Sequence, residues 1–235
     1  MPKIKGIKGF FGVSLIEYPG HISSVVFLGG CDLRCPFCQN RDLVLKADKI
    51  DDLDFDELLE TLELRKQMIE GVSITGGEPL IFEDLEKMIK EFKRLNLKIK
   101  IDTNGYHPDR LQSLIDSKLV DYAAMDIKTS LDRYNEGCGK KVDIPRIEKS
   151  IDILLAGKVD YEFRTTCVPT IVTEREIELI SKRIQGANLY ALQQFRNENL
   201  LDKKWEKISP YERHVIKEFA EFASGYAKKV VVRGA

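Results

Sequence analysis

Strand-like and helix-like segments alternate along most of this chain, and the alternation constrains its fold more than any other feature of the sequence. Apolar and β-branched runs predict strands at 22–28, 72–75, 98–103, 122–128, 160–168, 188–195 and 229–233. Apolar residues at helical spacing predict helices at 54–68, 82–95, 108–117, 144–156, 174–184 and 210–224. The chain is therefore expected to contain six strand–helix units followed by one short strand.

Repeated strand–helix units specify parallel strands joined by right-handed crossovers. A closed barrel of eight such units typically takes about 250 residues, whereas this chain has 235 residues and six complete units. We therefore predict an α/β fold of parallel strands, a partial (βα)6 TIM-like barrel with an open side. An open doubly wound sheet is the alternative. Residues 1–235 are expected to form a single domain, in which 22–233 make the barrel and 1–20 an N-terminal appendage, such as a short hairpin.

The composition argues against several classes of protein. The chain has 37 basic and 38 acidic residues, so we expect no nucleic-acid partner, because binding to phosphate backbones needs a basic surface. No segment approaches the roughly 18 consecutive apolar residues of a membrane span, and the N-terminus has no apolar signal-peptide core. We therefore expect a cytoplasmic protein without a membrane partner. Five cysteines, three of them in one loop, do not resemble a secreted disulfide framework.

Three cysteines, Cys31, Cys35 and Cys38, follow the first expected strand of the barrel. Thiolates are soft ligands, and three of them on one loop can converge on a single metal centre. A structural zinc site takes four ligands, whereas a four-iron cluster on three thiolates leaves one iron open for chemistry. The candidates for a fourth zinc ligand are His21, Cys138 and Cys167. Inert buried cysteines are the remaining interpretation of the loop.

The other cysteines and the histidines carry weaker signals. Cys138 and Cys167 have no partner cysteines at metal-binding spacing, so ordinary packing or loop placement is expected for both. His21, His107 and His214 have no second ligand three or four residues away. We therefore predict no imidazole ligand.

Polar residues and glycines lie where the expected strands end. The second to sixth strands of the barrel end in Gly76-Gly77-Glu78-Pro79, Asp102-Thr103-Asn104-Gly105, Met125-Asp126-Ile127-Lys128, Arg164 and Gln193-Gln194-Phe195-Arg196. Because the carboxyl ends of parallel strands meet at one edge, we expect these residues to lie close together. The glycines allow close approach of backbone to a ligand, and Glu78 offers a carboxylate to an amine. Asp102 and Asp126 suit ribose hydroxyls or a cation, while Lys128 and Arg164 suit a carboxylate.

These motifs together resemble the radical S-adenosylmethionine superfamily. The similarity rests on the Cys-x3-Cys-x2-Cys loop, with Phe37 before its last cysteine, and on the Gly-Gly-Glu-Pro turn further along. The matching frame covers nearly the whole chain. The resemblance implies a 4Fe-4S cluster on Cys31, Cys35 and Cys38, whose open iron binds the amino and carboxylate groups of S-adenosylmethionine.

The resemblance also implies an activity. In that superfamily an electron from the cluster cleaves the sulfonium and gives methionine and a 5'-deoxyadenosyl radical. Iron–sulfur potentials reach about −700 mV at their low end, where this reduction becomes conceivable. Phe37 would lie near the adenine, and Gly76, Gly77 and Glu78 would hold the methionine amino group. The three cysteines would be the catalytic residues, with the protein supplying the geometry.

Within the superfamily, the chain is most similar to the activating enzymes of glycyl radical proteins. The shared segments are Tyr18-Pro19-Gly20, Cys38-Gln39-Asn40, Asp102-Thr103-Asn104-Gly105, Asp126-Ile127-Lys128, Phe163-Arg164 and Val168-Pro169. By this resemblance Asp102, Asp126, Lys128 and Arg164 line the cofactor site, and a monovalent cation is implied near Asp102, Thr103 and Asp126. The radical would take a hydrogen from the α carbon of one glycine in a large partner enzyme. A donor such as flavodoxin or ferredoxin would reduce the cluster.

Two departures from the family pattern bear on function. Many members have His at the position of Gln39, so a role tied to that imidazole is in question here. The chain also lacks an inserted ferredoxin-like segment, so it resembles the compact activases of pyruvate formate-lyase and of anaerobic ribonucleoside-triphosphate reductase. Its length and the segments 17–20 and 193–196 favour the latter. Two alternatives stay open: a small-molecule enzyme similar to the 7-carboxy-7-deazaguanine synthases, and a non-enzymatic zinc or cluster module that binds a partner.

Overall fold

The computed structural model describes residues 4–234; residues 1–3 and 235, at the ends of the expected single domain, lie outside the described residues. Within this part, eight strands form one sheet in the order β1-β2-β3-β4-β5-β6-β7-β8. The strands are β1 (Ile7–Tyr18), β2 (His21–Leu28), β3 (Gly71–Gly76), β4 (Lys98–Thr103), β5 (Tyr122–Asp126), β6 (Asp160–Cys167), β7 (Tyr190–Gln194) and β8 (Val230–Arg233). Strands β2 to β8 run parallel to one another, and β1 pairs antiparallel with β2.

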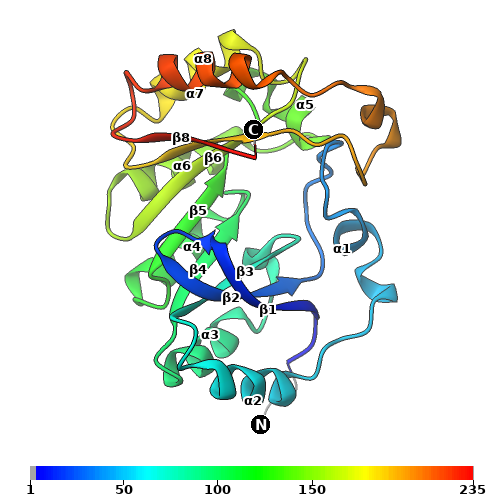
Figure 1. Ribbon diagram of the computed structural model, residues 1–235, viewed down its shortest axis with the longest axis vertical. Coiled ribbons are helices and arrows are strands. Elements are labelled where there is room, and N and C mark those ends of the chain that lie inside the picture. The colour runs from blue at the N-terminus through cyan, green and yellow to red at the C-terminus, as the bar shows by residue number, and fades with distance from the viewer. Residues whose placement is uncertain (1–3, 235) are drawn as a thin grey trace.

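The strand order confirms the partial barrel of parallel strands. A doubly wound sheet reverses its strand order at a switch point, whereas here each strand lies next to its neighbours in sequence. The alternative of a doubly wound sheet is therefore wrong. The sheet curls as strands are added (Figure 1), yet in residues 4–234 β8 forms no ladder with β1. The barrel is open between its first and last strands.

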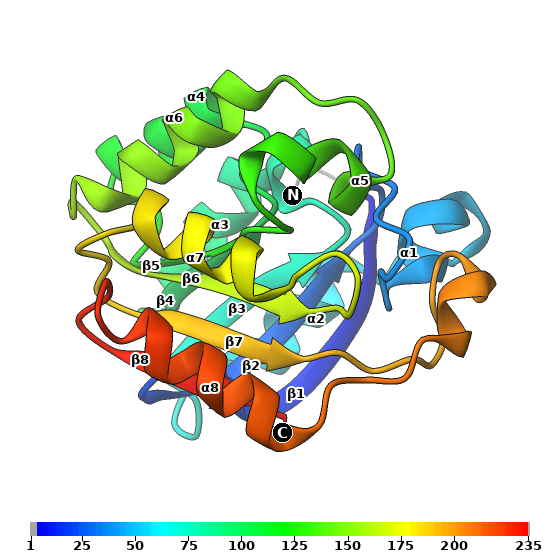
Figure 2. The same ribbon diagram turned by 90° about the horizontal axis from the view of Figure 1, so that it is seen from above.

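Six helices lie on the outer side of the curled sheet (Figures 1 and 2). They are α2 (Phe55–Arg65), α3 (Leu85–Arg94), α4 (Pro108–Asp116), α6 (Ile144–Leu155), α7 (Glu174–Arg183) and α8 (Arg213–Ala223). Each matches an expected helix to within a few residues. The Asp54 carboxylate accepts hydrogen bonds from the amides of Asp56 and Glu57 and so begins α2. None of the helices in the described residues is long and apolar enough to cross a membrane.

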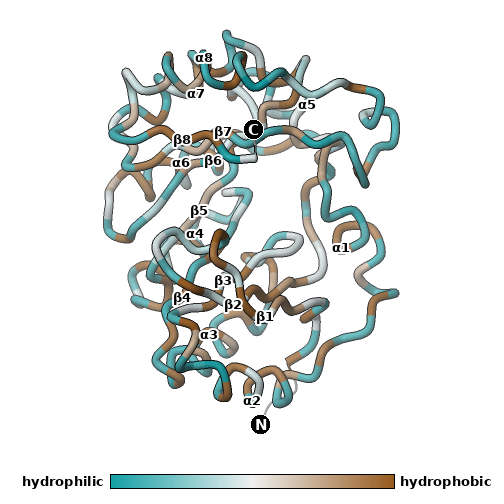
Figure 3. Tube along the Cα trace, in the orientation of Figure 1, coloured by the Kyte–Doolittle hydropathy of each residue, from teal (hydrophilic) through white to brown (hydrophobic). Residues whose placement is uncertain are grey.

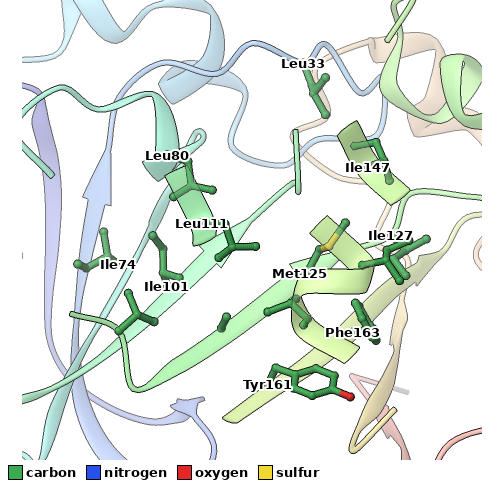
Figure 4. Packing of buried hydrophobic residues seen from close by; sticks show 14 of the residues in the cluster. Leu33, Ile74, Leu80, Ile101, Leu111, Met125, Ile127, Ile147, Tyr161 and Phe163 are labelled. Carbon is green, nitrogen blue, oxygen red and sulfur yellow. The ribbon is translucent and has the colours of Figure 1, made fainter. Parts of the chain in front are cut away.

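Side chains alternate along the strands between two faces of the sheet. One face packs into the hydrophobic core under the helices, and the other faces the inside of the barrel and is mostly polar. Ile74, Ile101, Met125 and Phe163, from four consecutive strands, are fully buried in the main hydrophobic cluster (Figure 4). Figure 3 shows hydrophobic residues along the strands and many hydrophilic ones on the peripheral helices and loops. Successive side chains of a strand point to opposite faces, so the neighbours of the core residues face the inside of the barrel. These neighbours are Ser73, Thr75, Lys100, Asp102, Ala124, Asp126, Glu162 and Arg164.

The N-terminal segment differs from our expectation of an appendage. Strand β1 is twelve residues long and pairs with β2 across the turn at Pro19 and Gly20, so it forms one edge of the main sheet. Gly20 has φ of +77°, which suits a tight turn that glycine adopts readily. Register shifts interrupt the pairing of β1 with β2. Such irregularities disturb the period-two pattern, which is why the sequence suggested at most a short hairpin in the appendage and not a long strand of the main sheet.

Several short elements were not expected either. They are α1 (Arg41–Leu45), α5 (Tyr134–Cys138) and the 3-10 turns η1 (Ala47–Lys49), η2 (Pro79–Ile81), η3 (Leu131–Arg133) and η4 (Lys203–Lys207). A helix of one turn does not display a helical period in its sequence. Figure 2 shows α1, α5 and the segment containing η4 around the end of the barrel where the parallel strands finish.

Candidate active site

A cavity of about 360 Å³ lies at the carboxyl ends of the strands, within the size range of small-molecule sites. It brings together almost all the residues predicted from the strand ends. The predicted residues that line it are Cys31, Cys35, Phe37, Cys38, Gly76, Gly77, Asp102, Asp126, Lys128 and Arg164. Among the residues predicted to bind the cluster or the cofactor, Glu78 alone does not line the cavity. The strand ends therefore converge as the parallel architecture requires.

The loop of Cys31 to Cys38 is held by backbone hydrogen bonds from distant parts of the chain. The Arg34 amide donates to the Cys138 carbonyl at 3.0 Å, beside α5. The Leu201 amide donates to the Cys38 carbonyl at 2.9 Å. These bonds fasten the loop between α5 and the segment that follows β7. The cysteines therefore sit on a braced backbone, which favours a defined ligand geometry.

The three thiols are largely withdrawn from water. Burial raises the pKa of Cys31 to about 12, and it also raises the pKa of Cys38. A hydrogen bond with the Cys138 thiol, together with burial, holds the pKa of Cys35 well above its usual value. A metal ligand must be a thiolate, so metal binding here displaces protons. Cys138, for which we expected ordinary packing, thus lies directly against this loop.

The spacing of the thiols bears on the choice between zinc and a cluster. In residues 4–234, no three His, Cys, Asp or Glu side chains lie close enough together to hold one metal ion. A single zinc ion draws its sulfur ligands to about 2.3 Å, whereas a cluster of four irons spreads its ligands further apart. Three thiolates on one loop match a cluster that leaves one iron open, whereas a structural zinc site takes four ligands.

The glycine turn after β3 packs directly against the start of the cysteine loop. The Gly77 amide donates to the Leu28 carbonyl, and the Glu78 amide donates to the Gly30 carbonyl. A Cβ atom at Gly77 would lie only 1.7 Å from the Gly30 carbonyl oxygen, so no side chain fits there. Gly76 has φ of +121°, a conformation that side chains rarely allow. The two glycines thus join the two main motifs of the sequence.

The Glu78 carboxylate points into the protein rather than into the cavity. It is 1% exposed and accepts hydrogen bonds from the Leu80 amide, the Thr103 hydroxyl and the Asn104 amide. Burial raises its pKa to about 7, although the three donors partly oppose this. Glu78 therefore ties the glycine turn to the end of β4. Contact with a methionine amino group stays a prediction.

We expect Glu78→Gln to destabilise the cluster-free protein by about 1–3 kcal/mol. The new amide would turn an N–H toward the Asn104 amide, which leaves that buried donor without an acceptor. The free energy of unfolding, measured with denaturant, tests this. Glu83→Gln is the control, because Glu83 is an exposed neighbour. An equally small effect of both variants would contradict the role given to Glu78.

A network of buried charges lines the inner wall of the cavity. The Arg164 Nε donates to Asp126 at 2.7 Å, and its Nη1 lies 3.3 Å from Asp102. Lys128 donates to Asp126 at 3.1 Å, and Lys100 donates to Asp102. Burial alone would raise the pKa of Asp126, but Arg164 and Lys128 outweigh it and hold that pKa well below its usual value. These acids are ionised and balanced by cations.

Binding of a monovalent cation near Asp102 and Asp126 remains a prediction. The Thr103 hydroxyl donates to Glu78. Asp102 and Asp126 are each paired with basic side chains. Oxygen ligands do suit such a cation. A cation here would share these carboxylate oxygens with the basic side chains that already pair with them.

Other residues line or support the cavity, and no binding role was predicted for them from the sequence. Asn40 donates from its side chain to the Gly76 carbonyl at 2.6 Å. The Phe37 ring lies 6.1 Å from the Trp205 ring, so η4 covers the aromatic residue of the loop. The cavity is also lined by Glu17, Gln39, Thr75, Thr166, Gln193 and Arg196. Cys167 is buried, and no site residue is among its hydrogen-bond partners.

Of the three histidines, His107 reaches the cysteine loop, and the expectation of no imidazole ligand stays a prediction. The His107 Nε2 lies 2.8 Å from the Asp32 carboxylate, and that pairing spans 75 residues of sequence. His21 contacts Glu70 at the other end of the barrel, and His214 is exposed on α8. Only spatial proximity links His107 to the site, so no local pattern could identify it.

Sequence comparisons agree with this geometry. Residues 25–184 match the profile of the radical SAM superfamily. A protein of Methanocaldococcus jannaschii, provisionally named a glycyl-radical enzyme activating enzyme, is 33% identical over 97% of this chain and 95% of its own length. The pyruvate formate-lyase-activating enzyme of Clostridium pasteurianum is 35% identical over 121 residues, 49% of either chain.

Solved structures agree on the fold. Streptococcus suis SuiB bound to its precursor peptide SuiA superimposes with a TM-score of 0.67 at 16% identity, over 88% of this chain. This chain spans 48% of the SuiB chain. TYW1 with a bound lysine–pyruvate adduct superimposes with a TM-score of 0.62 at 16% identity, over 92% of this chain and 76% of TYW1.

The family therefore rests on three observations that agree with one another. The curled sheet has the architecture of these solved structures. The cysteine loop and the glycine turn meet in one cavity. The match to the superfamily covers more than half of the sequence, and the Methanocaldococcus relative matches almost all of it. The chain is a radical S-adenosylmethionine enzyme, a member of the family of glycyl-radical enzyme activating enzymes.

Proposed function

We propose that this enzyme activates a glycyl radical enzyme, and that its partner is an anaerobic ribonucleotide reductase. The observation that carries the activase function is the similarity to the Methanocaldococcus protein along nearly the full length of both chains. The choice of partner rests on the compact length and on the segments 17–20 and 193–196. We place the reaction in the cytoplasm, within one radical SAM domain, with flavodoxin or ferredoxin as the electron donor.

The residues around the cavity fit a 4Fe-4S cluster and S-adenosylmethionine, the cofactors that family membership implies. Cys31, Cys35 and Cys38 would hold the cluster as thiolates, and the braced loop favours a fixed arrangement of the three. When bound, the cluster supplies the electron for reductive cleavage of S-adenosylmethionine. Each activation of one glycine would consume one electron and one molecule of S-adenosylmethionine. The products would be methionine, 5'-deoxyadenosine and a glycyl radical on the partner.

The chemistry of the cavity wall supports recognition of S-adenosylmethionine. This cofactor carries an ammonium group, a carboxylate, a ribose diol and an adenine. The cavity offers carboxylates at Asp102 and Asp126, cations at Lys128 and Arg164, and an aromatic ring at Phe37. Each group of the cofactor thus has a complementary group in the wall. The buried setting strengthens such contacts relative to water.

The open side of the barrel supports a macromolecular substrate. Strands β1 and β8 form the two free edges in the described residues. Because the two edges are not paired with each other, a peptide segment of a partner has a route toward the strand ends that a closed barrel lacks. The glycine to be activated belongs to a folded partner, so a loop of that partner has to enter. An opening beside the cavity meets this need.

Two other functions are supported by relatives that match only part of this chain. The match to the pyruvate formate-lyase-activating enzyme favours that lyase as the partner, but it covers half of the chain. A 39% identity over 93 residues to the 7-carboxy-7-deazaguanine synthase of Hyperthermus butylicus favours a small-molecule substrate, over 39% of the chain. Neither match extends along the chain as far as the Methanocaldococcus protein does.

An electron paramagnetic resonance experiment tests the proposal. The reconstituted, reduced enzyme is incubated with S-adenosylmethionine and purified anaerobic ribonucleotide reductase. We expect the doublet signal of a glycyl radical on the reductase, and no signal when its radical glycine is replaced by alanine. Pyruvate formate-lyase is tested in parallel. Cofactor cleavage without a radical on either protein would overturn the proposal.

A further inference from the structure

Asn104, which follows β4, points its side-chain amide at the first cysteine of the loop. Its Nδ2 lies 3.8 Å from the Cys31 sulfur and 3.1 Å from the Asp32 carboxylate. Asn104 is 6% exposed, so water does not compete for these contacts. The Cys31 sulfur also accepts from the Leu33 backbone amide at 3.4 Å. Asn104 is therefore a side-chain donor to a residue that would bind iron.

The orientation of this amide is fixed by its own oxygen. The Tyr106 backbone amide donates to the Asn104 Oδ1 at 2.8 Å, so that atom has to be an acceptor. The other end of the group is then the NH2, and it faces an ionised carboxylate and a sulfur, which both accept. The Asn104 backbone is held as well, because its amide donates to Glu78 at 2.7 Å. Both the position and the direction of the donor are determined.

Asp32 and His107 complete the arrangement. One carboxylate oxygen of Asp32 accepts from Asn104, and the other lies 2.8 Å from the His107 Nε2. Since the carboxylate can only accept, the imidazole nitrogen donates. The Asp32 backbone carbonyl accepts from Lys140 at 2.8 Å. Asp32 is thus held from two sides, and it keeps Asn104 beside Cys31.

A donor at this position changes the energetics of electron uptake. A reduced cluster carries one more negative charge than the oxidised form, and part of that charge resides on the sulfur ligands. An N–H group aimed at such a sulfur stabilises the reduced form more than the oxidised form. Hydrogen bonds to sulfur are among the factors that set iron–sulfur potentials. Loss of the donor therefore shifts the potential to more negative values.

We propose that Asn104 is a positioning residue that raises the reduction potential of the cluster through an N–H···S hydrogen bond to Cys31, and that Asp32 and His107 hold it there. This inference rests on the cluster assignment in the proposed function, but it involves neither the partner enzyme nor the cleavage of S-adenosylmethionine. It concerns how readily the cluster accepts an electron from its donor.

The experiment is a redox titration of the reconstituted enzyme, followed by absorbance and electron paramagnetic resonance, without S-adenosylmethionine or partner. We expect Asn104→Ser to shift the midpoint potential to more negative values at unchanged iron content. The matched control is Asn197→Ser, because the Asn197 side-chain amide donates to the Glu206 backbone carbonyl and Asn197 does not line the cavity. The control variant should keep the wild-type potential.

Variants at His107 keep the test decisive if Asn104→Ser fails to assemble a cluster. His107→Phe preserves a ring beside Tyr106 but removes the donor to Asp32, so the potential should shift in the same direction by a smaller amount. His107→Gln supplies an N–H group again and should restore the wild-type value. Unchanged potentials in both Asn104→Ser and His107→Phe, or an equal shift in Asn197→Ser, would overturn the proposal.

The outcomes also separate this inference from the proposed function. If the potentials shift as expected but no partner acquires a radical, the proposed function fails and the role of Asn104 stands. If a partner is activated while the potentials are the same in all variants, the role of Asn104 fails alone.

Discussion

Replacement of Cys35 by alanine abolishes cluster assembly and leaves the barrel folded. Cys35 is the middle one of the three proposed ligands and is 7% exposed, and its thiol interacts with that of Cys138. Two thiolates do not hold a 4Fe-4S cluster as three do. Iron content should fall from about four atoms per chain to near zero, and S-adenosylmethionine cleavage should disappear. The expected loss of folding stability is only about 1–3 kcal/mol, as for most single substitutions.

Cys167→Ala is the matched control for this result. Cys167 is also a buried thiol, but it does not line the cavity. This variant should keep the full iron content while losing a similar amount of stability. Iron analysis, visible absorbance and thermal unfolding are measured on both variants. Retained S-adenosylmethionine cleavage by Cys35→Ala would contradict the ligand assignment.

Replacement of Arg164 by methionine should destabilise the cluster-free fold by about 3–5 kcal/mol. Arg164 pairs with both Asp102 and Asp126 inside the barrel. Its removal leaves the negative charges of two buried carboxylates with fewer cations to balance them. Methionine fills much of the space of the arginine side chain, so the effect reports mainly the lost charge. The free energy of unfolding measures the effect. Arg175→Met, at an exposed and paired arginine, should have a much smaller effect, because exposed ion pairs contribute little to stability.

The cost of Arg164→Met should also depend on pH. In the wild-type protein the pKa values of Asp102 and Asp126 are lowered, so their stabilising contribution is present at neutral pH and is lost as the pH falls through the folded values. Without Arg164, burial favours the protonated acids, so the variant gains stability relative to wild type as the pH falls. The difference between the two proteins should shrink from pH 7 toward pH 4. A constant difference over that interval would contradict the charge network.

The strand ends of the barrel could be predicted because they depend on local patterns. Runs such as 98–103 and 122–128 are apolar and end in polar residues, and a parallel sheet gathers these ends at one edge. The spacing of the three cysteines indicated a metal centre. The parallel topology predicted that they lie near Gly76, Asp102 and Arg164, and all of these residues line the cavity.

Other features depend on contacts between distant residues and have no local pattern. The pairing of β1 with β2 is irregular, so its sequence does not alternate as an expected strand does. Glu78 turns inward because three donors meet its carboxylate, two of them from the end of β4. His107 reaches Asp32 across the mouth of the barrel. In each case the tertiary structure decides the role of the side chain.

The most direct test of the central claim follows one hydrogen atom. The partner reductase is produced with glycine deuterated at its α carbon and is activated by this enzyme with unlabelled S-adenosylmethionine. If the enzyme takes hydrogen from a glycine of the partner, mass spectrometry should find one deuterium in each 5'-deoxyadenosine formed during activation. Deuterium-free 5'-deoxyadenosine, formed while the partner acquires its radical, would contradict direct abstraction from glycine.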